Sequence, residues 1–260
     1  MPIDMKQIFR DARQNAAGEI RDSIFAKDTS FEEHDKFMRS IDENSRFTES
    51  FLALLAAAMV ICTLGLLMNS PAVIIGGMII SPIMWPIMKL SAGISFQNRS
   101  YVWRAAVLLI VSVIFAVLSS AVITMVSPMK ALDAEILART TPGILDIVVA
   151  LASGLVGALA MIKPRISENL AGVAIAVSLM PPLCVSGIGI ALSNGLVAGA
   201  GMFLFIENVA AIAFAATAVF VFYAYRVTGH MTVFRKRGLT VLLSILAVIS
   251  LISLIITLQR

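Results

Sequence analysis

Long uncharged apolar runs alternate along the chain with short polar segments. The runs that contain no Asp, Glu, Lys or Arg span residues 50–88, 105–129, 147–162, 169–206, 208–225 and 238–259. A helix needs about 20 apolar residues to cross a hydrocarbon core roughly 30 Å thick. Two of the runs are long enough for about two crossings, so each of them is expected to contain a turn.

Turn signals divide both of these long runs. Asn69-Ser70-Pro71 interrupts the first, because proline ends one helix and fits the first turn of the next. Ser193-Asn194-Gly195 interrupts the second as a turn triplet. The pattern therefore predicts an all-α polytopic membrane protein with about seven transmembrane helices, at residues 51–68, 71–96, 102–126, 144–162, 170–192, 196–224 and 239–258.

Composition agrees with this pattern and argues against several classes of protein. Of the 260 residues, 59% are hydrophobic and 14% are charged, and the mean hydropathy is +0.93. An average soluble domain is about one quarter charged. These values argue against a soluble enzyme, a nucleic-acid-binding domain and a disordered chain. We expect an integral membrane protein whose surroundings are the lipid bilayer.

The distribution of charge predicts an orientation. Residues 1–50 hold 8 Lys and Arg against 11 Asp and Glu, whereas residues 51–260 hold 12 against 5. With a cytoplasmic N-terminus and seven crossings, eight Lys or Arg lie in inner connections and three in outer ones, as the positive-inside rule requires. A rival topology, with 71–96 and 170–192 as re-entrant hairpins, gives six against five. We predict full crossings, with the N-terminus cytoplasmic and the C-terminus outside.

The first 50 residues are expected to form a polar cytoplasmic segment without a core of its own. They contain no apolar stretch typical of a signal peptide. Ser30-Phe31-Glu32-Glu33 has the form of a capping box, and Phe37, Ile41 and Phe51 follow at loosely helical spacing. This pattern predicts an amphipathic helix that leads into the first span.

Two apolar segments, 69–83 and 169–183, suggest an internal repeat. Each begins at an Asn, continues with small and apolar residues, and reaches a proline pair or near-pair about 12 residues later. The identical pairs, 100 residues apart, are Asn69 and Asn169, Val73 and Val173, Ile75 and Ile175, and Pro82 and Pro182.

One apolar helix precedes each segment and one follows it, so the repeating unit has three helices. An odd number of crossings inverts the second copy, which is an arrangement known in secondary transporters. The predicted organisation is a first repeat at 51–126, an outer connection at 127–143, a second repeat at 144–225, and a basic inner loop with a C-terminal helix at 226–260.

Prolines and polar residues inside the predicted helices are the candidate functional groups. Proline has no backbone donor and leaves the carbonyl four residues earlier without its helical partner, and in hydrocarbon that carbonyl needs another. Two Pro-broken helices can therefore line a solute or ion site near the midplane, although kinks that only set helix packing are the alternative. The candidate substrate- or ion-binding residues are Ser81, Pro82, Trp85, Pro86, Lys89, Ser178, Pro181, Pro182, Glu207 and Asn208.

Two charged residues stand out among these candidates. Glu207 lies about 12 residues into helix 196–224, where an acid costs at least about 2.5–3.5 kcal/mol to insert. It is interpreted as a proton site or as a protonated group that hydrogen-bonds between helices. Lys89 is interpreted as a counter-ion to Glu207, as a contact for an anionic solute, or as a side chain that extends to the inner interface.

Other residue types carry no predicted chemistry. Asp146 and Glu168 lie close to helix starts, where a negative charge suits the helix dipole. Cys62 and Cys184 have no spaced Cys or His partner and are interpreted as packing residues. The sequence shows no phosphate loop, metal-spaced cluster or nucleophile elbow. We therefore expect no enzymatic activity, no metal and no cofactor.

The two proline segments resemble a known family. They read P-A-V-I-I-G-G-M-I-I-S-P-I-M-W-P-I at 71–87 and A-G-V-A-I-A-V-S-L-M-P-P-L-C-V-S-G-I at 171–188. These look like the paired hallmarks of domain-of-unknown-function family 389, hydrophobic membrane proteins of bacteria and archaea. The resemblance covers roughly residues 50–225 and implies a multi-pass protein of the prokaryotic cytoplasmic (inner) membrane. It also implies that the family-type positions are Pro82, Pro86, Pro181, Pro182 and Asn208, whereas Glu207 departs from a usually uncharged position.

Three functions remain open on the sequence alone. The first is a secondary transporter of a small solute or ion, with a midplane site between the two proline-containing helices. The second is an ion channel, formed as an oligomer. The third is a non-transporting scaffold or lipid-interacting protein. No nucleic-acid partner is expected, and the sequence leaves a homo-oligomer open.

Overall fold

The computed structural model describes residues 31–162 and 168–228, and the side chains of residues 37–162 and 178–224. All regular elements within these ranges are helices. They are α2 (Phe31–Asn44), α3 (Glu49–Leu67), α4 (Pro71–Ile80), α5 (Met84–Ser95), α6 (Arg99–Val126), α7 (Ala134–Leu137), α8 (Ile144–Ile162), α9 (Glu168–Ala191) and α10 (Gly195–Thr228). The predicted helix at 239–258 lies outside the described residues.

Several of these helices are long and apolar enough to cross a membrane. In the described part of the chain, α3, α6, α8 and α10 as far as Ala224 meet this condition, and α4 with α5 is a fifth candidate as one bent span. The apolar part of α9 that was searched, Ser178–Ala191, is shorter. An all-helical, multi-pass architecture is therefore confirmed in outline, with four or five candidate spans against seven predicted.

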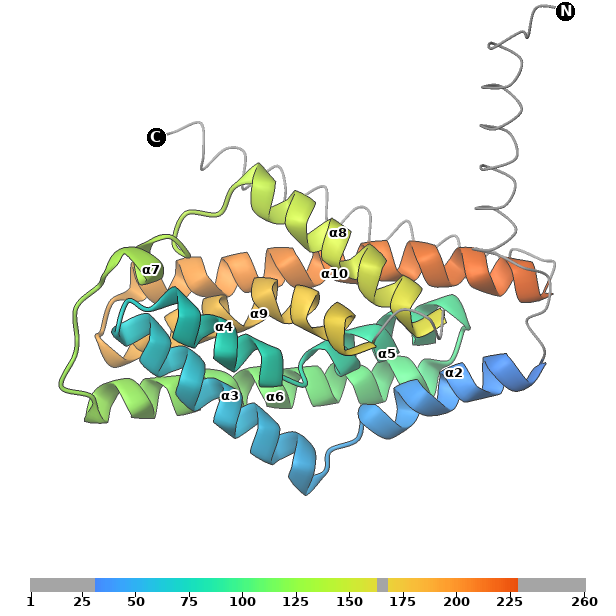
Figure 1. Cartoon of the computed structure of the whole chain (residues 1–260), viewed down its shortest axis with the longest axis horizontal. Coiled ribbons are helices and arrows are strands. Elements are labelled where there is room, and N and C mark those ends of the chain that lie inside the picture. Colours follow the sequence, from blue (N-terminus) through green and yellow to red (C-terminus); the bar gives the residue numbers. More distant parts are fainter. Residues whose placement is uncertain (1–30, 163–167, 229–260) are drawn as a thin grey trace, which may run out of the picture.

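The long helices lie roughly along one axis of the molecule. Figure 1 shows α6 and α10 as two long rods that run in opposite chain directions. Helix α2 lies at one end of the bundle and α7 at the other (Figure 1). The chain therefore passes repeatedly between the two ends, as expected of a multi-pass membrane protein.

Three tight hairpins of one type connect α3 to α4, α5 to α6, and α9 to α10. Each contains a non-glycine residue at positive φ, namely Asn69 (51°), Gln97 (59°) and Ser193 (54°). The next residue donates its N–H to a glycine carbonyl five positions earlier, over 2.9, 2.9 and 2.8 Å, which is the longer bond of a Schellman motif. Both turn triplets identified in the sequence lie at such hairpins.

The glycines at these hairpins, Gly65, Gly93 and Gly189, let the two helices touch. A Cβ atom added to each would lie 2.7, 2.8 or 2.3 Å from a backbone nitrogen of the following helix. Real Cβ atoms do not approach a neighbour so closely, so each position requires glycine. The contact fixes how closely the second helix folds back on the first.

The two proline segments differ in structure. Helix α4 ends at Ile80 and α5 begins at Met84, with a bend of 50° between them, so the predicted break at Pro82 is present. The second predicted break is wrong, because α9 continues through Pro181 and Pro182. Helix α9 stays continuous because α10 supplies the hydrogen bond that the proline cannot make, as described below.

The predicted amphipathic helix is α2, which packs on one end of the bundle. Phe37 and Ile41 are buried. The ring of Phe37 lies 5.2 Å from that of Phe220, 5.7 Å from Tyr223 and 6.0 Å from Phe96, measured between centroids. Helix α2 therefore buries its apolar face against the membrane helices instead of forming a core of its own.

Close helix packing leads to a first prediction. A Cβ atom on Gly154 of α8 would lie 2.5 Å from the carbonyl oxygen of Ile212 in α10, whereas one on Gly199 would meet nothing within 4 Å. We expect Gly154→Ala to lower the free energy of unfolding by about 1–3 kcal/mol, because α8 must move away from α10. Gly199→Ala, the matched control, is expected to be neutral or stabilising. Thermal unfolding in detergent micelles tests this, and equal melting temperatures for the two variants would contradict it.

Candidate functional site

A polar cavity of about 240 Å³ lies between α8, α9, α10 and the end of α7. Its polar lining residues are Arg139, Asp146, Ser178 and Asn208, and its apolar lining includes Pro182 and Leu204. Three of the ten predicted site residues, Ser178, Pro182 and Asn208, are therefore brought together. The cavity is the candidate functional site.

The hydrogen bond between α10 and α9 explains how proline is accommodated here. Pro182 has no N–H, so the carbonyl of Ser178, four residues earlier, lacks its helical donor. The Asn208 side-chain amide donates to this carbonyl over 2.7 Å. An amide from a neighbouring helix thus replaces the missing backbone bond, and α9 stays helical through the proline pair.

Further contacts hold α9 in the same place. The Ser186 hydroxyl donates to the carbonyl of Pro182 over 3.2 Å, and Ser120 of α6 donates to the carbonyl of Cys184 over 2.8 Å. A Cβ atom on Gly201 of α10 would lie 2.7 Å from the Pro182 carbonyl oxygen. The backbone of α9 is therefore held from both α6 and α10 beside the cavity.

The cavity carries two charges that the sequence analysis did not select. Arg139, at the C-terminal end of α7, lies 3.3 Å from Glu135. Asp146 accepts a hydrogen bond from the backbone of Gly143 over 2.9 Å, so it caps α8 as its position near a helix start suggested. It also lines the cavity. Arg139 and Asp146 line the same cavity because of how the 127–143 connection folds, which the sequence pattern does not show.

Glu207 does not line this cavity. Its side chain is completely buried near the middle of the apolar part of α10, next in sequence to Asn208. A buried acid at this position on a membrane helix is a functional-site hypothesis by default, because inserting one is costly. Glu207 therefore remains a candidate proton site, adjacent in sequence to the cavity-lining Asn208.

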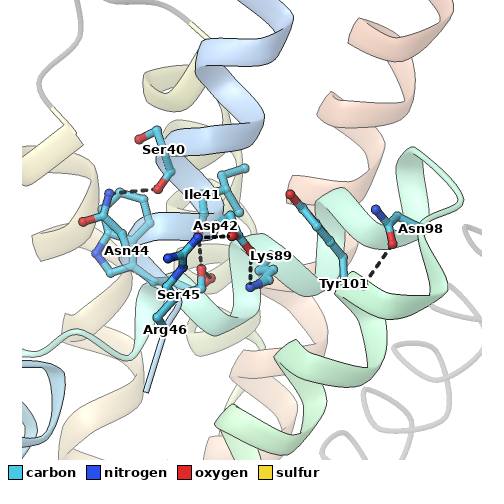
Figure 2. A network of polar contacts seen from close by, with 10 residues as sticks. Ser40, Ile41, Asp42, Asn44, Ser45, Arg46, Lys89, Asn98 and Tyr101 are labelled. Atoms are coloured by element: carbon cyan, nitrogen blue, oxygen red, sulfur yellow. Dashed lines mark hydrogen bonds and ion pairs between the residues drawn. The ribbon is translucent and has the colours of Figure 1, made fainter. Parts of the chain in front are cut away.

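Lys89, which follows the first proline segment in sequence, belongs to a different polar cluster, shown in Figure 2. Lys89 of α5 is only 2% exposed, and its Nζ lies 2.8 Å from Oδ1 of Asp42 in α2 and 5.2 Å from the centre of the Tyr101 ring. The interpretation of Lys89 as a counter-ion to Glu207 is therefore replaced by an ion pair with α2. Lys89 extends towards α2 at the end of the bundle, so the interpretation of a side chain that extends to the inner interface stays a prediction.

Asp42 is the centre of this cluster. It accepts hydrogen bonds from Lys89 and from Arg46, each over 2.8 Å (Figure 2). The hydrogen bond from Lys89, followed by that from Arg46, lowers the pKa of the Asp42 carboxyl below its ordinary value of 3.8. The carboxylate is therefore charged under physiological conditions and binds α2 to α5.

The remaining predicted site residues lie near the break between α4 and α5. The Ser81 hydroxyl accepts from the backbone of Ile83 over 3.4 Å, and the Trp85 backbone N–H bonds the carbonyl of Pro82 over 3.2 Å. These two bonds, with Pro86 in the first turn of α5, form a local turn and contribute nothing to the 240 Å³ cavity. Pro181 is likewise absent from its lining.

Within the described residues, no group of three His, Cys, Asp or Glu side chains is placed to hold a metal ion. The cavity wall carries a small set of hydrogen-bond donors and acceptors, from Arg139, Asp146, Ser178 and Asn208. Such a site can bind a polar solute or ion by hydrogen bonds and charge.

The long apolar helices are typical of a multi-pass α-helical membrane protein. The chain belongs to the family described as domain of unknown function (DUF389), which matches residues 78–214, just over half of its length. The resemblance identified from the two proline segments is thereby confirmed. The chain is also 27% identical, over 179 residues, to an uncharacterized protein of Methanocaldococcus jannaschii. The match covers 69% of this chain and 55% of that relative, so the chain spans about half of the relative's length. No solved structure matches the chain.

Proposed function

We propose that the protein is a secondary transporter of a small polar solute or ion, built as an inverted repeat of three plus three helices. The observation that carries the proposal is reciprocal packing. The Ser91 hydroxyl of α5 bonds the Ala213 carbonyl of α10 over 3.3 Å, and a Cβ atom on Gly187 of α9 would lie 2.5 Å from the Val117 carbonyl of α6. Position 91 plus 96 is 187, and position 117 plus 96 is 213. The contact between α5 and α10 therefore corresponds to the contact between α9 and α6, with the two halves exchanged.

The hairpins support the same correspondence. A shift of 96 residues relates Gly93 to Gly189 and Asn98 to Asn194. The Asn98 side chain accepts from the backbone of Tyr101 over 3.1 Å, and the Asn194 side chain accepts from Val197 over 3.2 Å. The third helices of the two units, α6 and α10, run in opposite directions (Figure 1). Opposite directions are expected when an odd number of crossings separates two copies.

The two copies differ in length at their proline segments. There are 24 residues from Asn69 to Gly93, but 20 from Asn169 to Gly189. This explains why the identities between Asn69 and Pro82 are 100 residues from their counterparts, whereas the contacts from Ser91 onwards are related by 96. The four additional residues of the first copy lie in the stretch that contains the break between α4 and α5.

The cavity suggests what is transported. A volume of about 240 Å³ leaves room for several waters, which suits a small solute or a hydrated ion. Arg139 and Asp146 present opposite charges, and Asn208 and Ser178 are polar. We propose a prokaryotic inner membrane, a cytoplasmic N-terminus, and a cavity that faces the outer connection 127–143.

Thiol accessibility tests the proposal without knowledge of the substrate. Ser178→Cys places a thiol in the cavity wall, whereas the native Cys62 and Cys184 are buried. A membrane-impermeant maleimide should label the Ser178→Cys variant from either side of oriented vesicles, because alternating access exposes the site in turn. The unmodified chain is the control. Labelling from neither side would contradict the transport proposal. Steady ionic currents in a planar bilayer would favour a channel instead.

Glu207 gives a second prediction within this framework. If its proton is coupled to the change between the two states, the rate of labelling at Ser178→Cys depends on pH, and Glu207→Gln abolishes that dependence. Glu49→Gln, which changes an exposed acid in the first turn of α3, is the matched control and should preserve it. An unchanged pH profile in Glu207→Gln would remove the proton role while leaving the transport proposal intact.

A further inference from the structure

A second and larger cavity of about 490 Å³ lies where α2, α5 and the start of α6 meet. This is the end of the bundle opposite to α7 (Figure 1). Its charged lining residues are Asp42, Arg46, Lys89 and Arg104. Three cations therefore face one anion, an excess of two positive charges. Both Lys89 and Arg46 are paired with Asp42, and Arg104 takes part in none of the ion pairs found among the described residues. The lining is suited to an anionic group.

The other wall of this cavity is apolar and belongs to α6. Trp103, Val107 and Val111 line it at intervals of four residues, so they lie on one face of the helix. Trp103 is 71% exposed, and the two valines are exposed as well. The same face continues towards the middle of the span with exposed Ile114 and Leu118. An apolar stripe thus leads from the cationic end of the cavity along a membrane-spanning helix.

A ligand for this site must combine an anionic head with an apolar tail. A free phosphate ion would use the arginines but would make no contact with the apolar wall, which on a membrane-spanning helix faces acyl chains. A tryptophan at the end of a membrane helix is typical of the interface at headgroup level. Basic pockets on the cytoplasmic side of membrane helices bind the phosphate groups of anionic lipids.

We propose that this cavity binds the headgroup of an anionic phospholipid, with its phosphate at Arg104 and Arg46 and an acyl chain along Trp103, Val107 and Val111 of α6. Lys89 stays paired with Asp42 in the cavity wall and does not bind the phosphate directly. The site lies in the leaflet of the N-terminal helix α2, which is the predicted cytoplasmic leaflet. It is separate from the polar cavity at α9 and does not depend on the transport proposal.

Tryptophan quenching by brominated lipid tests the proposal directly in the full-length chain. The chain has two tryptophans, so Trp85→Phe leaves Trp103 as the reporter. The probes are vesicles of phosphatidylcholine that contain brominated phosphatidylglycerol or brominated phosphatidylcholine. We expect Trp103 to prefer phosphatidylglycerol, and Arg104→Gln to reduce the preference about fivefold, the effect of one cation at a membrane surface.

Two variants separate a specific site from general surface charge. Arg99→Gln removes a cation from the first turn of α6 that does not line the cavity, and the preference should persist. Arg104→Lys keeps the charge and should retain most of it. Equal quenching by both lipids, an equal loss in Arg99→Gln and Arg104→Gln, or competition by inorganic phosphate with no lipid preference would each overturn the proposal.

Discussion

Replacing Asn208 with alanine is expected to lower the free energy of unfolding by about 1–3 kcal/mol, the cost of leaving a buried carbonyl without a donor. In the native protein the Asn208 amide bonds the Ser178 carbonyl over 2.7 Å, in place of the N–H that Pro182 lacks. Pro182→Ala restores a backbone donor to the helix at that position. The double variant, Asn208→Ala with Pro182→Ala, should therefore recover most of the lost stability.

Thermal unfolding of the four proteins in detergent provides the double-mutant cycle. Strictly additive effects of the two changes would show that Asn208 does not compensate for Pro182. The same proteins separate a structural from a functional role of the amide. In the Ser178→Cys background, recovered stability without recovered two-sided labelling would indicate that the Asn208 amide also acts in the transport cycle.

Replacing Asp42 with asparagine is expected to be the other large effect. Lys89 is 2% exposed, and Asp42, at 20%, is its ion-pair partner. Removing one partner of a buried pair leaves a buried charge uncompensated, which costs about 3–5 kcal/mol when both groups are buried. Because Asp42 is partly hydrated, we expect a loss of about 1–3 kcal/mol.

A double variant tests whether the loss comes from the ion pair, and a neighbouring acid provides the control. Lys89→Met combined with Asp42→Asn removes both charges and should restore much of the stability, since no buried charge remains. Glu43→Gln changes an exposed neighbouring acid and should have little effect. Thermal unfolding and protease cleavage between α2 and α3 measure the outcome. If the double variant is not more stable than Asp42→Asn, and Glu43→Gln loses as much stability as Asp42→Asn, the net charge and not the ion pair is responsible for the loss.

The pH dependence of this contact follows from the Asp42 carboxyl. Its pKa is lowered in the folded state, chiefly by the hydrogen bond from Lys89. A carboxyl with a lowered folded pKa stabilises the protein fully above its ordinary value of 3.8, and the contribution is lost as the pH falls below that value. The docking of α2 should weaken in that acidic range in the native chain. In Asp42→Asn this part of the pH dependence should be absent.

Four or five of the seven predicted spans, and the turns at 69–71 and 193–195, could be predicted from the sequence because bilayer thickness imposes a length on every apolar run. The boundaries of α8 agree with the prediction of 144–162. Lys89 could not be placed in this way, because its partner Asp42 lies 47 residues earlier in a polar helix. Its pairing depends on how α2 docks, which hydropathy does not describe.

The candidate site was predicted only in part, for a related reason. Proline pairs indicated correctly that backbone carbonyls need new partners, and Ser178, Pro182 and Asn208 do meet. Local rules predicted a break at Pro181-Pro182, but a donor from α10 keeps α9 helical. Arg139 and Asp146 were missed because a loop charge and a helix-start acid have no distinctive spacing. Their role emerges only when the 127–143 connection folds over the helix ends.

The unequal proline segments make the two halves mechanically different. One segment has a joint between α4 and α5, whereas the other is a continuous rod held by a side-chain amide. In a carrier built from two equivalent inverted halves, a two-fold rotation about an axis in the membrane plane relates the inward- and outward-facing forms, which then have similar energies. If the protein is the carrier proposed above, we expect its two forms to be populated unequally, because bending is easier in the half that contains α4 and α5. A resting protein would then face mostly one side of the membrane before any solute binds.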